Sequence, residues 1–116
     1  MGRTIYAVVF LGTYVVVLVA SLVPASSLPQ VTLSDKIEHF LAYAVLAVLG
    51  ARALPGRPWL LAIVLAANGV GVEILQQAMA LGRQGEVLDA LANTLGIAAG
   101  LGAASLMRRR ERGGAR

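Results

Sequence analysis

The sequence predicts an all-α fold, a polytopic membrane protein with four transmembrane helices in a compact bundle. Of the 116 residues, 58% are hydrophobic and only 14% are charged, and the mean hydropathy is +0.76. A typical soluble domain carries about 25% charged residues. Four apolar segments, each close to the roughly 20 residues that a spanning helix needs, account for nearly the whole chain. We therefore expect one membrane domain over residues 1–107 and a basic tail over residues 108–116.

The first apolar segment covers residues 4–23 and contains no charged side chain. Because Arg3 precedes it, a cleaved signal peptide is the alternative interpretation. Its apolar stretch of about 19 residues exceeds the roughly 7–15 residues of a signal-peptide core, which favours a spanning helix. The second segment, residues 34–54, starts with a polar turn and ends before Pro55, which breaks helices.

The third segment covers residues 59–81 and begins at Trp59, whose amphipathic ring suits a membrane interface. The fourth segment covers residues 86–107. It carries small residues at a spacing of four, namely Ala92, Gly96, Gly100 and Ala104. Small residues at this spacing let a second helix backbone approach closely. The second helix belongs to the same bundle in one interpretation, and in the other the Gly96/Gly100 face forms a homo-oligomer.

Positive charge is divided unevenly between the two sides of the predicted bundle. Four spans place both termini on the same side as the loop between the second and third segments. That side holds eight basic residues: Arg3, Arg52, Arg57, Arg108, Arg109, Arg110, Arg112 and Arg116. The opposite side holds Lys36 and Arg83. Because cytoplasmic loops are enriched in Lys and Arg, we expect both termini to be cytoplasmic.

Composition excludes several classes of function. The chain has no cysteine, which excludes disulfides, thiolate metal sites and thiol nucleophiles. The net charge of +4 comes from residues at helix ends and in the tail, with no soluble fold to present them. We therefore predict the lipid bilayer as the main partner, no nucleic-acid partner, no cofactor and no bound metal.

Polar side chains recur at helical spacing near the predicted end opposite the termini. Residues three or four apart share one helix face. Such stripes are formed by Asp35, Glu38, His39 and Tyr43 on the second segment, by Glu73 and Gln76 on the third, and by Glu86, Asp89, Asn93 and Gly96 on the fourth. Glu73 lies about 12 Å inside its helix end, at a depth where a carboxylate facing lipid is costly. We therefore expect the stripes to converge into one pocket, and we interpret Asn68, nearer the membrane centre, as an interhelical hydrogen-bonding residue.

The order of these residues resembles the VanZ-like family of small bacterial membrane proteins. The second segment reads Asp35-Lys36-x-x-His39-x-x-x-Tyr43. The third and fourth segments read Glu73-x-x-Gln76, then Arg83, then Asp89-x-x-x-Asn93-Thr94-Leu95-Gly96. The similarity spans about residues 35–100. Carried over by position, it implies a candidate pocket of Asp35, Lys36, His39, Tyr43, Glu73, Gln76, Arg83, Asp89 and Asn93.

The resemblance implies a multi-pass protein of the bacterial cytoplasmic membrane with a role in the cell envelope. The family takes its name from a protein associated with low-level resistance to the glycopeptide teicoplanin. The outward-facing pocket is then expected to bind a lipid, a lipid-linked cell-wall intermediate or the glycopeptide, with Lys36 and Arg83 holding a phosphate or carboxylate.

Two alternatives stay open. One is a membrane-embedded enzyme that acts on an envelope lipid through the same Glu, Asp and His residues, by proton transfer or with a divalent metal. The other is a small proton-coupled transporter.

Overall fold

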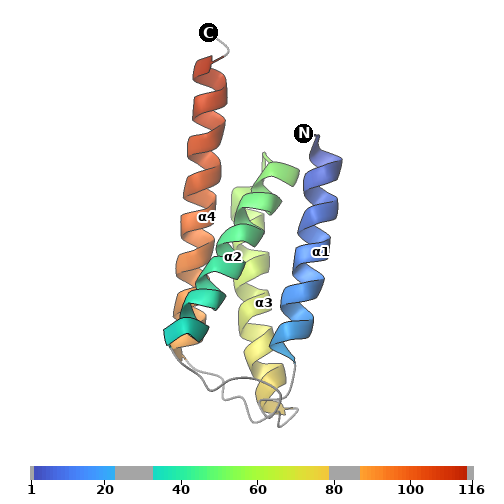
Figure 1. The fold of residues 1–116 in the computed structure, drawn as a ribbon, viewed down its shortest axis with the longest axis vertical. Coiled ribbons are helices and arrows are strands. Elements are labelled where there is room, and N and C mark those ends of the chain that lie inside the picture. Colours follow the sequence, from blue (N-terminus) through green and yellow to red (C-terminus); the bar gives the residue numbers. More distant parts are fainter. Residues whose placement is uncertain (1, 23–32, 79–86, 115–116) are drawn as a thin grey trace.

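The computed structural model describes residues 2–22, 33–78 and 87–114, which form four helices (Figure 1). The helices are α1 (Arg3–Ser21), α2 (Leu33–Ala53), α3 (Pro58–Ala78) and α4 (Val87–Gly114). The start of α1, the turn between α2 and α3, and the C-terminus of α4 lie towards one end of the bundle (Figure 1). The first residues of α2 and α4 lie at the other end. The all-α prediction is confirmed.

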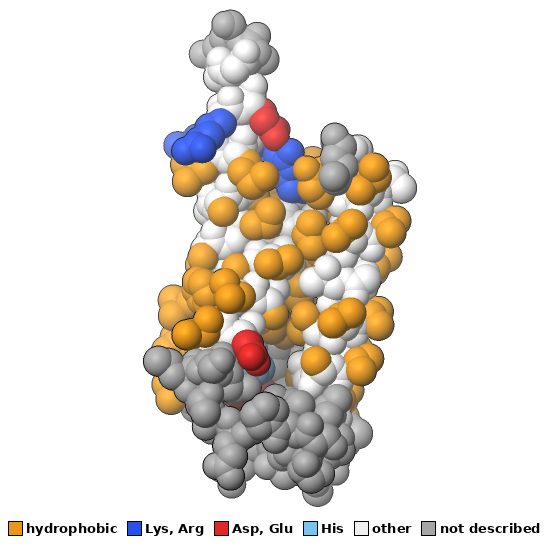
Figure 2. Space-filling model, in the orientation of Figure 1, with side chains coloured by type: hydrophobic (Ala, Val, Ile, Leu, Met, Phe, Trp, Pro, Cys, Tyr) orange, Lys and Arg blue, Asp and Glu red, His pale blue; other side chains and the backbone are white. Residues whose placement is uncertain are grey.

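Three helices are long and apolar enough to cross a membrane, namely Arg3–Ser21, Pro58–Ala78 and Leu88–Gly114. At 1.5 Å per residue, the two shorter ones reach about 30 Å, which is the thickness of a bilayer's hydrocarbon core. Their apolar side chains mostly face outward, and no residue of α1 is buried. Figure 2 shows hydrophobic side chains along the flank of the bundle. An exposed surface this apolar indicates a membrane protein.

Helix α2 falls outside this group because four charged residues occupy its first two turns and its last turn. They are Asp35, Lys36, Glu38 and Arg52. The helix nevertheless occupies the centre of the bundle, since it packs most extensively against α4 and also contacts α1 and α3. The membrane character of the protein is therefore shown by three helices, and a fourth span stays a prediction.

Helix α4 is longer than its predicted span. It continues from Val87 to Gly114, so residues 108–114 of the predicted basic tail are helical. Its 28 residues correspond to about 42 Å, which exceeds the hydrocarbon thickness by about two turns. Figure 2 shows Lys and Arg side chains gathered near this projecting part of the molecule.

The closest backbone approach in the bundle joins α2 and α4, which run parallel (Figure 1). Both Gly96 and Gly100 are buried and face α2. A Cβ atom at Gly96 would overlap the carbonyl oxygen of Phe40, and one at Gly100 would overlap the carbonyl oxygen of Ala44. The Gly96/Gly100 face is therefore covered by α2 within the same chain.

An apolar core fills the half of the bundle nearer the chain termini. It is formed by Tyr43, Leu46, Ala47, Ala51, Leu61, Leu65, Ile97 and Ala104. Helix α1 packs against this core through Phe10, Tyr14 and Val17, which share one face at helical spacing. The described residues with buried polar side chains, Gln76, Asp89 and Asn93, lie in the other half. The bundle thus has an apolar half and a polar half.

We expect Gly96→Ala to lower the free energy of unfolding by about 1–3 kcal/mol, because the added methyl group must push α4 away from the carbonyl oxygen of Phe40. The matched control is Gly102→Ala, on the same helix, where an added Cβ has no neighbour within 4 Å. Unfolding of the detergent-solubilised protein by sodium dodecyl sulfate, followed by circular dichroism, measures both effects. Equal destabilisation by the two substitutions would contradict the role of the glycine contact.

Candidate functional site

Two polar pairs join α2 and α4 at the end opposite the chain termini. The Nζ atom of Lys36 donates to Oδ1 of Asp89 at 2.5 Å. One turn further along, Nδ1 of His39 lies 3.1 Å from Oδ1 of Asn93. The first residues of the pairs are three apart on α2 and the second residues are four apart on α4, so each helix presents them on one face. Parallel packing then brings the two stripes together in register.

The Lys36–Asp89 ion pair is partly accessible. The side chains are 20% and 11% exposed, respectively, so the ammonium group is the more accessible partner. Burying either charge alone is costly, and the pairing offsets that cost. In the second pair, an amide oxygen only accepts hydrogen bonds, so Nδ1 of His39 is the donor for this orientation of Asn93.

A hydrogen-bonded rung crosses the middle of the bundle through three helices. The hydroxyl of Tyr14 on α1 donates to Oδ1 of Asn68 on α3 at 2.7 Å. The amide Nδ2 of Asn68 donates in turn to the hydroxyl of Tyr43 on α2 at 3.1 Å. The interpretation of Asn68 as an interhelical hydrogen-bonding residue is confirmed. The hydrogen bond of Tyr14 was not predicted. In the sequence, only its helical spacing from Phe10 and Val17 indicates that it faces the interior of the bundle.

Helix α3 approaches these groups at Gly69, a buried residue that the motif pattern does not include. A Cβ atom there would lie 3.1 Å from Nδ2 of Asn93 and 3.4 Å from the hydroxyl of Tyr43. Glycine therefore leaves room for an amide and a phenol against the α3 backbone. Glu73 follows one turn later on the same face of α3, and its Oε1 atom is buried.

Gln76 has a different role from the other predicted site residues. Its Nε2 atom donates to the backbone oxygen of Ser21 at 2.6 Å. Ser21 is the last residue of α1, where helical carbonyl groups have no partner within their own helix. An unsatisfied carbonyl is costly next to lipid, so Gln76 stabilises the end of α1. The side chain is only 3% exposed.

The structure brings together most of the predicted site within the residues it describes. The polar cluster consists of Lys36, His39, Tyr43, Asn68, Glu73, Asp89 and Asn93. Arg83 and the side chain of Asp35 fall outside the described residues. Across residues 2–22, 33–78 and 87–114, no group of three His, Asp or Glu side chains is arranged to hold a metal ion. The contacts within the cluster are an ion pair and hydrogen bonds between helices.

We expect Lys36→Met and Asp89→Asn each to lower the free energy of unfolding by about 1–3 kcal/mol, because each leaves its partner without the ion pair. The double variant should lose less than the sum, with a coupling energy of about 0.5–3 kcal/mol. Glu38→Gln, at an exposed carboxylate on α2, is the control and should have little effect. Unfolding in sodium dodecyl sulfate measures all four proteins, and strictly additive losses would contradict the coupling.

Comparison with known proteins gives no match to this chain among family models, curated proteins or solved structures. Its function is therefore proposed from the geometry of the polar cluster and from the order of its motifs.

Proposed function

We propose that this chain is a VanZ-like membrane protein whose polar cluster binds a molecule of the bacterial cell envelope. The observation that carries the proposal is the pairing of Lys36 with Asp89 and of His39 with Asn93 at one end of two parallel helices. Polar and ionisable groups within a membrane bundle are expensive to maintain and mark functional sites by default. The motif order of the VanZ-like family supports the same assignment.

The proposed topology has four spans with both termini in the cytoplasm. The charges of α2 lie in its end turns, and its middle from Phe40 to Ala51 is uncharged, as in a spanning helix. The end of the bundle with the chain termini carries most of the arginines, which favours a cytoplasmic position for that end. The polar cluster then lies towards the outer face of the cytoplasmic membrane.

Lys36 is the proposed point of contact with a phosphate or carboxylate. Its ammonium group carries the positive charge that pairs with Asp89, and the lysine side chain is 20% exposed. A ligand phosphate or carboxylate would be attracted to this charge. The amide of Asn93 and the imidazole of His39 are suited to sugar hydroxyl or amide groups. A lipid, a lipid-linked cell-wall intermediate and a glycopeptide all combine these chemical features.

The described residues favour binding over transport and over metal-dependent catalysis. A proton-coupled transporter needs a polar path through the bundle, whereas Leu46, Leu65 and Ile97 belong to the apolar core beyond the polar cluster. A metal-dependent enzyme needs convergent ligands, and the described residues contain no group of three.

Single-cysteine variants test the proposed topology without background labelling, because the chain contains no cysteine. A membrane-impermeant maleimide applied to intact cells should label Gly85→Cys, in the connection between α3 and α4. It should label Arg57→Cys and Gly113→Cys only after the membrane is permeabilised. Labelling of Arg57→Cys in intact cells would reverse the orientation and place the polar cluster on the cytoplasmic side.

Native mass spectrometry tests ligand binding with two probes added separately, a lipid-linked peptidoglycan precursor and teicoplanin. We expect wild type to retain at least one probe, and Lys36→Met to retain about tenfold less, because this variant removes the ammonium group that is proposed to contact the ligand anion. Glu38→Gln removes an exposed carboxylate at the same end and should bind like wild type. Retention of neither probe by wild type, or equal retention by all three proteins, would refute the proposed site.

A further inference from the structure

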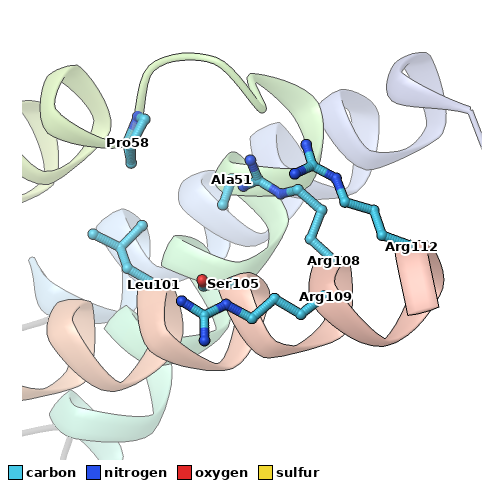
Figure 3. Close-up of a pocket in the computed structure, with 7 residues that line it drawn as sticks. All are labelled: Ala51, Pro58, Leu101, Ser105, Arg108, Arg109 and Arg112. Carbon is cyan, nitrogen blue, oxygen red and sulfur yellow. The ribbon is translucent and has the colours of Figure 1, made fainter.

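A second site lies at the opposite end of the bundle, between α4 and the turn that joins α2 to α3. A pocket of about 320 Å³ opens there. Arginine side chains form its charged side, namely Arg108, Arg109 and Arg112. Figure 3 shows Arg109 running back along α4 towards Ser105, whereas Arg108 reaches across towards Ala51. The pocket therefore concentrates positive charge outside the polar cluster.

The chemistry of the pocket changes in order along one face of α4. Leu101, Ser105, Arg108 and Arg112 line it at helical spacing and cover about 16 Å of the helix. This face is apolar at Leu101, carries a hydroxyl at Ser105, and is cationic at the two arginines. Pro58, at the start of α3, forms an apolar wall opposite. A phospholipid has the same order of chemistry from its acyl chains to its phosphate.

Among the described residues that line the pocket, three are arginines and none is acidic. The carboxylate of Glu111 pairs with Arg52 at 2.5 Å and also interacts electrostatically with Arg108. Arg108 donates one hydrogen bond to the backbone oxygen of Pro55 at 2.8 Å, which uses one of the five donors of its guanidinium group. No carboxylate among the described residues pairs with Arg109 or Arg112. Both side chains are exposed.

The depth of the pocket matches the membrane interface. Trp59 follows Pro58 in the first turn of α3 and is 81% exposed. Tryptophan is enriched at the level of lipid headgroups, where its apolar ring and polar N–H are both accommodated. On α4, the last apolar residue before the arginines is Met107. The arginines thus project where phosphates lie, and Leu101 lies where acyl chains begin.

We infer that this pocket binds the phosphate of an anionic glycerophospholipid, with the acyl chain against Leu101 and Pro58. Basic pockets between membrane helices recognise anionic headgroups through charge and hydrogen bonds, and arginine contacts a phosphate through two donors at once. The inference depends on the insertion of the bundle in a membrane, and it is independent of the ligand proposed for the polar cluster.

Native mass spectrometry of the full chain tests the inference, with phosphatidylglycerol and zwitterionic phosphatidylcholine as probes at equal concentration. The pocket variant is Arg109→Gln with Arg112→Gln. The matched control is Arg3→Gln with Arg110→Gln, which removes the same charge from exposed positions that do not line the pocket. We expect the pocket variant to retain about tenfold less phosphatidylglycerol than wild type, and the control to stay within about twofold. Wild type should retain phosphatidylglycerol in preference to phosphatidylcholine.

Three outcomes would overturn the inference. Equal losses in the pocket and control variants would show general attraction to positive charge. Equal retention of the two lipids by wild type would show no headgroup selectivity. Displacement of phosphatidylglycerol by millimolar inorganic phosphate would show that a free anion suffices. Circular dichroism confirms that each variant is helical, and Arg112→Gln alone, at an exposed position, provides a milder variant that should show a partial loss.

Discussion

The close contact of α2 with α4 is the constraint on which the other features depend. Gly96 and Gly100 place the α4 backbone against the carbonyl oxygens of Phe40 and Ala44, and a side chain at either glycine would prevent this approach. Helices that touch at this distance cannot slide past each other without a clash. The contact therefore sets the register in which Lys36 meets Asp89 and His39 meets Asn93. On α4, Asn93 lies about one turn before Gly96 and Asp89 lies one turn before Asn93, so both pairs are nearer the start of the helix than the glycines.

The bundle separates two kinds of chemistry by an apolar layer. One end holds paired polar side chains that are buried or half-buried, and the other holds arginines that are mostly exposed. Between them, Leu46 and Leu65 are fully buried and leave the interior apolar. The rung from Tyr14 through Asn68 to Tyr43 marks the boundary and ties α1 to α3 and α2. Each end can therefore interact with its own leaflet independently of the other.

Helix positions could be predicted because the apolar segments are interrupted by proline and glycine, as at Pro55 and Gly56. The extension of α4 beyond residue 107 could not be predicted from hydropathy, because hydropathy falls at Arg108. The helix nevertheless continues to Gly114, and arginine and glutamate are good helix formers. Helical spacing predicted that the polar stripes would converge. Individual pairs such as Lys36 with Asp89 depend on how α2 and α4 are aligned along their length. The spacing of residues within one helix gives no information about this alignment.

Tyr14 and Gly69 show why part of the site was missed. A single hydroxyl in an otherwise apolar helix hardly changes its hydropathy, so Tyr14 resembled any lipid-facing aromatic residue. Glycine is common in membrane helices, and nothing adjacent to Gly69 in the sequence indicates that an amide and a phenol approach it from other helices. Contacts between residues far apart in the chain decide both roles.

The parallel arrangement of α2 and α4 also has a consequence for biosynthesis. Because α3 separates them in the chain, the face of α2 that receives Gly96 and Gly100 has no cover until α4 leaves the ribosome. During that interval, Lys36 and His39 lack the partners that α4 supplies. A nascent chain that stalls before α4 would leave this face of α2 uncovered.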